Sequence, residues 1–289
     1  MELSNLSIDE LNQLQYAAEK KYAELIRGCE PFSEERARIT AEAYAKAAEF
    51  VDERNARSGA VRAYGADALY ISFIKSAAEH LRALCGTDDE LVFYEAGVGT
   101  GYIVRALGEE TGFQIYGCDV FLTEELKKEF PNLHEASLKS SLESLPDDFI
   151  DLIYWNDVME HMPADEIESL LKLLARKCKP GGLLITITPS AYNGPHDITR
   201  LADPSAKEAH GLHLKEYALK DVLNLYKKTG WKPAGRAKGK AIDFSDFERY
   251  YTLRVIAEEV IHSRLFAKLF PEKSRRFNYI STTVATPVK

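Results

Sequence analysis

The chain has 289 residues, of which 45% are hydrophobic and 28% charged, as in a globular protein with a sizeable core. Its net charge of −8 argues against nucleic acid as a partner, because phosphate binding depends on a basic surface. No apolar run approaches the roughly 18 residues needed to cross a membrane, and no secretory signal pattern is visible. The four cysteines show no paired spacing, which favours reduced thiols in a cytoplasmic protein over disulfides or a zinc site.

The first 60 residues predict amphipathic helices. The first helix begins at the capping box of Ser7 and breaks at Gly28, and two more are expected at about 33–57 and 66–84. These helices precede the expected sheet. We therefore interpret residues 1–60 as an N-terminal helical cap and the remainder, 61–289, as the main domain.

From residue 91 onward, short apolar runs alternate with amphipathic helices, a pattern typical of a parallel α/β sheet. Seven strands are expected, at 91–95, 114–118, 133–136, 149–155, 183–188, 232–236 and 279–285. Helices are expected near 101, after Thr123, and at 163–179, 215–229 and 246–269. The last of these is a helical insertion before the final strand.

A glycine-rich loop, Glu95-Ala96-Gly97-Val98-Gly99-Thr100-Gly101, joins the first strand to the next helix. Glycine lets the backbone turn tightly and approach a ligand that any Cβ would push away. Asp119 follows the second strand, where a carboxylate can accept both hydroxyls of a ribose. Tyr102 stands where a dinucleotide site would have its third glycine, which argues against an NAD-dependent reductase.

With these motifs the chain resembles the class I S-adenosylmethionine-dependent methyltransferases from about Leu91 to Lys289. The segment 145–161 and the Lys-Pro-Gly-Gly turn before the fifth strand belong to the same resemblance. It implies S-adenosylmethionine as cofactor and a Rossmann-like, mostly parallel sheet whose final strand is antiparallel beside the sixth. By position, the implied cofactor residues are Glu95, Gly97, Gly99 and Gly101 at the methionine end, Asp119 at the ribose, Val120 and Ser137 near the adenine, and Asn156 facing the sulfonium.

Histidines supply the candidate catalytic groups. Transfer of a methyl group to a hydroxyl or amine needs an aligned nucleophile and a proton acceptor, and the pKa of histidine lies near working pH. His161, His196 and His213 follow the fourth or fifth strand, at the edge where α/β sheets bind ligands. Structural roles are expected for His80, His134 and His262.

A metal site is the alternative use of the same segment. Asp157, Glu160 and His161 have i, i+3, i+4 spacing, which would place them on one helical face, and His213 could complete a site for Mg²⁺. The spacing resembles the metal site of small-RNA terminal 2′-O-methyltransferases and, more loosely, of the metal-dependent O-methyltransferases of ubiquinone synthesis. Asp157 replaces their usual Glu, and Glu-His here also occurs in metal-free relatives. A metal is therefore not favoured.

Segments outside the minimal fold are expected to hold the acceptor. The loop 189–214 and the stretch 241–272 are candidate substrate lids, and the candidate aromatic walls are Tyr16, Tyr22, Tyr44, Phe247, Tyr250 and Tyr251. Packing or a homodimer surface is the alternative role. The sequence favours O-methylation of a small molecule in biosynthesis, with no nucleic-acid or membrane partner. A Mg²⁺-dependent RNA 2′-O-methyltransferase and a non-catalytic S-adenosylmethionine-binding module are the alternatives.

Overall fold

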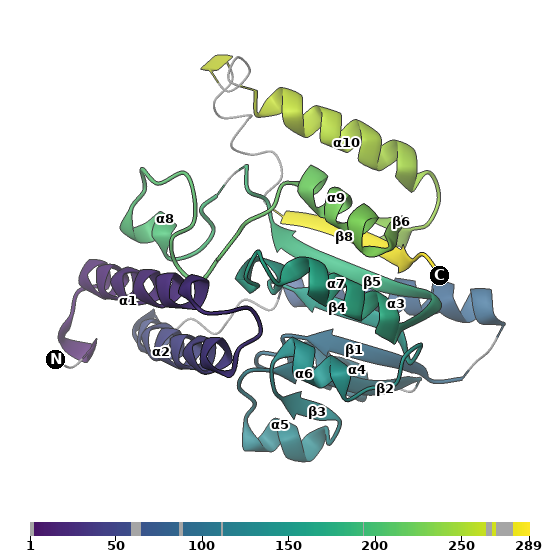
Figure 1. Cartoon of the computed structure of the whole chain (residues 1–289), viewed down its shortest axis with the longest axis horizontal. Helices are drawn as coiled ribbons and strands as arrows, with labels where there is room; N and C mark the ends of the chain where they lie inside the picture. The colour runs from purple at the N-terminus through teal and green to yellow at the C-terminus, as the bar shows by residue number, and fades with distance from the viewer. Residues whose placement is uncertain are drawn as a thin grey trace.

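The computed structural model describes residues 3–58, 65–86, 89–110, 112–192, 194–263, 268–269 and 280–289. Within them, an eight-stranded sheet has the order β3-β2-β1-β4-β5-β8-β6-β7 (Figure 1). Its parallel part comprises β1 (Leu91–Ala96), β2 (Phe113–Asp119), β3 (Leu133–Glu135), β4 (Ile150–Asn156) and β5 (Cys178–Pro189). The last strand, β8 (Ile280–Pro287), lies antiparallel between β5 and β6 (Trp231–Lys238), as the resemblance implied.

The prediction of seven strands is wrong by one. The additional strand, β7 (Ala241–Asp243), pairs antiparallel with β6 at the edge of the sheet. Gly239 allows the reversal because its φ of 62° lies in the left-handed region that favours glycine.

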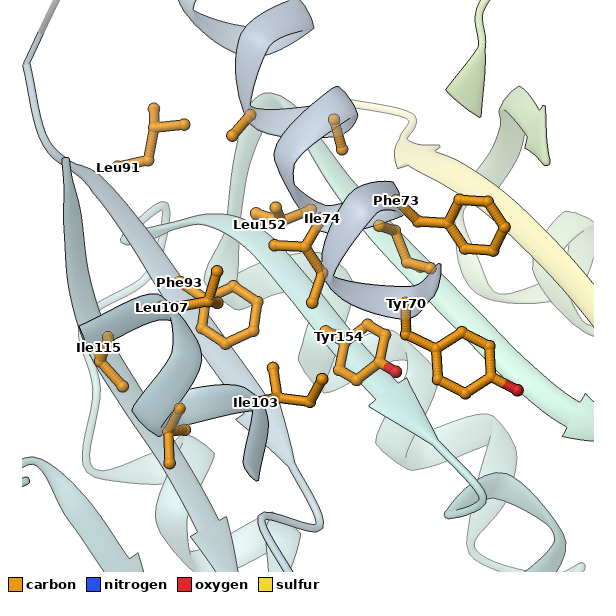
Figure 2. Close-up of a cluster of buried hydrophobic side chains, with 14 of the residues drawn as sticks. Tyr70, Phe73, Ile74, Leu91, Phe93, Ile103, Leu107, Ile115, Leu152 and Tyr154 are labelled. Atoms are coloured by element: carbon orange, nitrogen blue, oxygen red, sulfur yellow. The ribbon is translucent and has the colours of Figure 1, made fainter. Parts of the chain in front are cut away.

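Both faces of the sheet are covered, which explains why the side chains of its central strands β1 and β4 are mostly apolar and almost all buried. On one face, α3 (Gly65–Cys85) and α4 (Tyr102–Gly108) pack Ile74 and Leu107 against Phe93 and Tyr154, as Figure 2 shows. The other face is covered by α6 (Leu138–Glu143), α7 (Ile167–Lys177) and α9 (Leu219–Thr229). The six-residue α6 was not expected from the sequence.

The remaining helices of the described ranges are short or end earlier than predicted. They are α5 (Glu124–Glu129), α8 (Thr199–Ala202) within the loop after β5, and α10 (Phe247–Ile261). The helix expected at 246–269 therefore ends at Ile261 in the part described, and residues 264–267 lie outside it. None of the helices in the described ranges is long and apolar enough to span a membrane.

The cap consists of the short turn η1 (Leu3–Asn5) and the helices α1 (Ile8–Gly28) and α2 (Glu34–Ser58), which lie side by side at one end of the sheet (Figure 1). The buried Arg36 of α2 donates to Asp165 and Glu166 just before α7. Arg27 of α1 donates to the carbonyl of Leu214 at 3.0 Å. The cap is thereby fastened to segments that follow β4 and β5.

Candidate active site

The turn after β1 carries three glycines in the left-handed region, with φ of 75° at Gly97, 56° at Gly99 and 78° at Gly101. A Cβ on Gly97 would collide with Val158, and one on Gly101 would collide with Leu126. A Cβ on Gly99 would meet nothing within 4 Å. The turn is therefore packed against protein on two sides and open at Gly99, where a ligand can approach the backbone.

Asp119, at the end of β2, lies beside that open side. Its Oδ2 accepts from the backbone N–H of Gly99 at 2.7 Å, and its Oδ1 accepts from Phe121 at 3.2 Å. Burial raises the pKa of the half-buried carboxyl, and these backbone hydrogen bonds oppose the rise. The next residue, Val120, is also half-buried. Ser137 is exposed, and its hydroxyl accepts from Ser140 to cap α6, so its role at the adenine stays a prediction.

Two polar residues lie at the carboxyl ends of the central strands. Glu95 is buried in β1, and Asn156 ends β4 with its amide group donating to Asp157 Oδ2 at 3.2 Å. The Oδ1 atom of Asn156 is buried and accepts no hydrogen bond from the described residues. A buried acceptor without a donor is unfavourable, so it points to a bound group that supplies one. The arrangement fits a cofactor across Gly99, Asp119 and Asn156.

Beyond β4, Glu160, His161 and His213 converge, with one ligand atom of each lying within 4.8 Å of the others. The fully buried Glu160 accepts from Thr188 Oγ1 at 2.9 Å through Oε2, whereas its Oε1 has no hydrogen-bond partner in the part of the chain described. Burial and the nearby charge of Asp157 raise the pKa of Glu160 to about 8. This carboxyl group is suited to holding a proton or a cation.

Both histidines are oriented through Nδ1 by groups that can only accept a hydrogen bond. His161 Nδ1 lies 2.9 Å from the carbonyl of Leu212, and His213 Nδ1 lies 2.8 Å from Glu216 Oε1. Each Nδ1 therefore carries the hydrogen, and each Nε2 keeps a lone pair for a proton or a metal. Burial lowers the pKa of His161 to about 3. Burial also opposes the charged form of His213, but Glu216 and Glu160 outweigh it and raise the pKa of His213.

Asp157 does not share a helical face with this cluster. Its φ of 52° lies in the left-handed region. Within the segment 157–161, helical conformation is confined to the 3₁₀ turn η2 (Met159–His161). The expected i, i+3, i+4 face requires a continuous α-helix from residue 157, so that part of the prediction is wrong. Three of the four candidate ligands come together, and the charge of Asp157 contributes to the raised pKa of Glu160.

His196 stands apart from the other two candidate catalytic histidines. Its Nε2 lies 3.1 Å from the carbonyl of Ser190, and its backbone N–H donates to Glu216 Oε1 at 2.7 Å. This is the oxygen that orients His213. The sequence reasoning missed Glu216, for which the His213-x-x-Glu216 spacing was the available signal. His80 stacks on Phe244 at 3.5 Å, a structural role of the kind expected.

Among the aromatic residues expected to line a pocket, Tyr44 of α2 reaches the cluster. Its ring lies edge-on to His161, with ring centroids 5.6 Å apart. Burial, followed by the charges of Glu160 and Asp119, raises its pKa well above the ordinary value. Tyr251 instead donates to the carbonyl of Gly235 at 2.8 Å and holds α10 against β6. The cap, rather than α10, therefore supplies the aromatic wall of the cluster.

A family model described as a methyltransferase domain matches residues 70–234, more than half of the chain. The chain therefore belongs to the methyltransferase family and is a class I S-adenosylmethionine-dependent methyltransferase, which confirms the predicted enzyme class and cofactor. The comparison with curated proteins gives no match.

The chain is similar to several solved structures, two of which follow. The 1,6-didemethyltoxoflavin-N1-methyltransferase of Burkholderia thailandensis, with bound 1,6-didemethyltoxoflavin and S-adenosylhomocysteine, is 12% identical, with 90% of this chain and 93% of that chain covered and a TM-score of 0.51. A SAM-dependent methyltransferase from Archaeoglobus fulgidus is 21% identical, with 72% of this chain and 91% of that chain covered and a TM-score of 0.45. At such identities the likeness concerns the fold alone.

Proposed function

We propose that the enzyme transfers the methyl group of S-adenosylmethionine to an oxygen nucleophile of a small-molecule acceptor. The observation that carries the proposal is the cluster of Glu160, His161 and His213, which follows Asn156 at the carboxyl end of β4. A hydroxyl must lose its proton as it attacks the methyl carbon, so a proton acceptor has to be at hand. The cluster supplies one beside the cofactor edge of the sheet.

The proposal gives the residues of the site separate tasks. S-adenosylmethionine supplies a methyl group that is activated by the sulfonium charge. In this proposal the Gly99 turn and Asp119 hold the cofactor, and Asn156 faces its sulfonium. His213 accepts the acceptor's proton on Nε2, while Glu216 stabilises the resulting imidazolium through Nδ1. Tyr44 and the cap helices exclude water from the reaction.

A small acceptor is favoured over a polymer because the cap covers this edge of the sheet. Tyr44 contacts His161, and Arg36 joins α2 to the segment before α7, so a long chain would have to displace the cap. The net charge of −8 also disfavours RNA. A cytoplasmic location and a role in biosynthesis belong to the same proposal.

The test is a methyl-transfer screen with the full chain. The protein and S-adenosylmethionine are incubated with a small-molecule extract or with RNA, and S-adenosylhomocysteine and singly methylated products are measured by mass spectrometry. We expect an O-methylated product from the small-molecule fraction, and none with Asp119→Ala. Methylation of RNA, without any methylated product from the small-molecule extract, would contradict the proposal. Cofactor binding without transfer to any acceptor would favour the non-catalytic module.

A metal-assisted form of the reaction is a second candidate, favoured by one observation. Glu160 Oε1 is buried without a hydrogen-bond partner among the described residues, close to two histidines whose Nδ1 atoms are held by acceptors and whose Nε2 atoms can bind an ion when the rings are neutral. One oxygen and two nitrogen ligands suit Mn²⁺, Fe²⁺ or Zn²⁺ better than Mg²⁺. An ion held there would help ionise the acceptor's hydroxyl.

The two forms differ in their response to chelation. Calorimetric titration of the chelator-treated protein with Mn²⁺, Zn²⁺ or Mg²⁺ tests for the site, with Glu160→Gln as the variant that removes the charged ligand. Micromolar binding that is lost in Glu160→Gln, together with activity restored by the ion, supports the metal-assisted form. Full activity after chelation, without ion binding, supports the metal-free form.

A further inference from the structure

A buried carboxylate of the first cap helix holds the loop that follows β5. Helix α1 lies beside α8, which belongs to that loop (Figure 1). Glu19 of α1 is 6% exposed, and its Oε2 accepts from the backbone N–H of Leu212 at 3.2 Å. Its Oε1 accepts from the side-chain amide of Gln15, one turn earlier on the same helix. Both oxygens of Glu19 therefore have donors, and one of them fixes the main chain at Leu212.

Leu212 is also the residue that places both histidines of the cluster. Its carbonyl accepts from His161 Nδ1 at 2.9 Å, and the same carbonyl carbon is bonded to the nitrogen of His213. The two histidine rings meet edge-on, with centroids 4.7 Å apart and planes at 82°. One residue thus carries the N–H that Glu19 binds and the carbonyl that His161 binds. A shift of that residue would move the ring of His161 relative to that of His213.

The surroundings of this segment leave its main chain little room to move. The side chain of Leu212 is buried and packs with Ile26 in the apolar cluster of the cap. The N–H of Gly211 donates to Asp197 Oδ2 at 2.8 Å. A Cβ on Gly211 would lie 2.6 Å from Asp197 Oδ2 and 2.6 Å from Glu19 Oε2. The loop therefore passes between two carboxylates, and any larger residue at 211 would displace one of them.

The burial of Glu19 is unfavourable in itself. Burial raises its pKa, the hydrogen bonds from Gln15 and Leu212 oppose the rise, and the charges of Asp197 and His213 act on it in opposite senses. An apolar side chain would fill the same space without the loss of hydration. It could not accept the N–H of Leu212, however, so this contact is what the carboxylate adds at the position.

We propose that Glu19 is a positioning residue of the active site, which fixes the ring of His161 through the main chain of Leu212. The inference adds a residue of the cap to the proposed function and rests on that function for its kinetic consequences. With the carbonyl of Leu212 in place, His161 keeps its hydrogen on Nδ1 and its lone pair on Nε2. If the carbonyl moves away, the neutral ring is free to carry its hydrogen on Nε2, and the lone pair at that atom is lost.

The tautomer of His161 tests the proposal without knowledge of the acceptor. In the full chain prepared with ¹⁵N-labelled histidine, proton–nitrogen NMR correlations show which ring nitrogen carries the hydrogen, and His161→Gln assigns the signals. The wild type should carry the hydrogen on Nδ1. Glu19→Ala should shift the ring to a mixture or to the Nε2 form. Glu24→Ala, which removes an exposed carboxylate from the same helix, should match the wild type.

Turnover should follow the tautomer once the methyl-transfer screen has supplied an acceptor. Glu19→Ala should lower kcat about tenfold, with the KM for S-adenosylmethionine changed by less than about twofold. Glu19→Gln should restore the tautomer and most of kcat. Its amide oxygen can accept from Leu212, while the amide of Gln15, whose Oε1 has no hydrogen-bond partner in the part of the chain described, can reverse to accept from its nitrogen.

Gly211→Ala reaches the same contact from the loop, because its Cβ would press on the carboxylates of Glu19 and Asp197. It should reproduce the altered tautomer even where Glu19→Ala does not fold. An unchanged tautomer in the folded variants, or a wild-type ring with its hydrogen on Nε2, would overturn the inference and leave Glu19 with a structural role. The expected tautomers in a wild type that transfers no methyl group would contradict the proposed function instead.

Discussion

The ring of Tyr44 lies edge-on to the ring of His161, with centroids 5.6 Å apart and ring planes at 66°. Tyr44 belongs to α2 of the cap, and His161 belongs to the 3₁₀ turn after β4. Burial and the charges of Glu160 and Asp119 raise the pKa of Tyr44. Its hydroxyl is therefore neutral in the field of Asp119 and of the cluster. The cap therefore contributes a side chain to the candidate active site through Tyr44.

Tyr44→Ala should impair acceptor turnover much more than cofactor binding. Removing the ring opens the site to water and frees the orientation of His161, so we expect kcat/KM for the acceptor to fall about 10- to 100-fold. The Kd for S-adenosylmethionine should change by less than about threefold. Tyr44→Phe keeps the ring and should lie close to wild type. Equal turnover in wild type and Tyr44→Ala would remove the cap from the site.

Asp119→Ala should weaken S-adenosylmethionine binding by about 100-fold, on the order of 3 kcal/mol. The variant loses the carboxylate proposed to accept the ribose hydroxyls and also the hydrogen bond that holds Gly99. Calorimetric titration measures the affinity directly. Asp203→Ala is the control, because Asp203 also accepts a backbone hydrogen bond but lies in the loop after α8. Similar affinities for the two variants would contradict the cofactor assignment.

Glu160 makes stability depend on pH in metal-free protein. Because its pKa is raised to about 8, its contribution to stability is fully present below the unfolded value of 4.5 and is lost as pH rises through 8. Relative to Glu160→Gln, the wild type should lose on the order of 3–4 kcal/mol between pH 5 and pH 8. Urea unfolding at several pH values measures this. A parallel pH dependence in both proteins would show that Glu160 does not titrate in this range.

Glu216 should set the pH at which the catalytic base becomes active. Its hydrogen bond raises the pKa of His213, so Glu216→Gln should move the acidic limb of the kcat profile to lower pH. His213→Gln should lower kcat by about 100-fold or more, with little change in cofactor affinity. An unchanged profile in Glu216→Gln, together with wild-type turnover in His213→Gln, would assign proton transfer to another group.

Much of the fold could be predicted from local pattern. Apolar runs such as Ile150–Trp155 read as buried strands, and the capping box at Ser7 marks the start of α1. Two of the short elements were not predicted, the three-residue β7 and the six-residue α6, although β3 and α5, which are equally short, were. The bounds of α7 were also predicted too long, since the helix begins at Ile167 and not at Pro163.

The two halves of the candidate site differ in how well the sequence predicts them. Gly99 and Asp119 follow consecutive strands, so their proximity is a consequence of parallel pairing of β1 with β2. The other half depends on loops: Glu216 bridges His196 and His213, and Tyr44 arrives from a helix before the sheet. Neither contact follows from a periodic pattern in the sequence, because the path of a loop depends on tertiary packing.

The attachment of the cap should depend on Arg36. Its side chain is 4% exposed and donates to Glu166 Oε1 at 2.6 Å and to Asp165 Oδ1 at 2.9 Å, and Glu166 is itself only 10% exposed. Arg36→Ala would leave Glu166 as a buried charge without its cation, which should lower the free energy of unfolding by about 3 kcal/mol.

Arg38→Ala, which breaks an exposed pair with Glu42 on the same helix, is the control and should lower the free energy of unfolding by less than about 0.5 kcal/mol. Urea unfolding gives both values, and hydrogen exchange should show faster exchange in α1 and α2 for Arg36→Ala only. If the two variants lose the same stability, the ion pairs of Arg36 do not hold the cap in place.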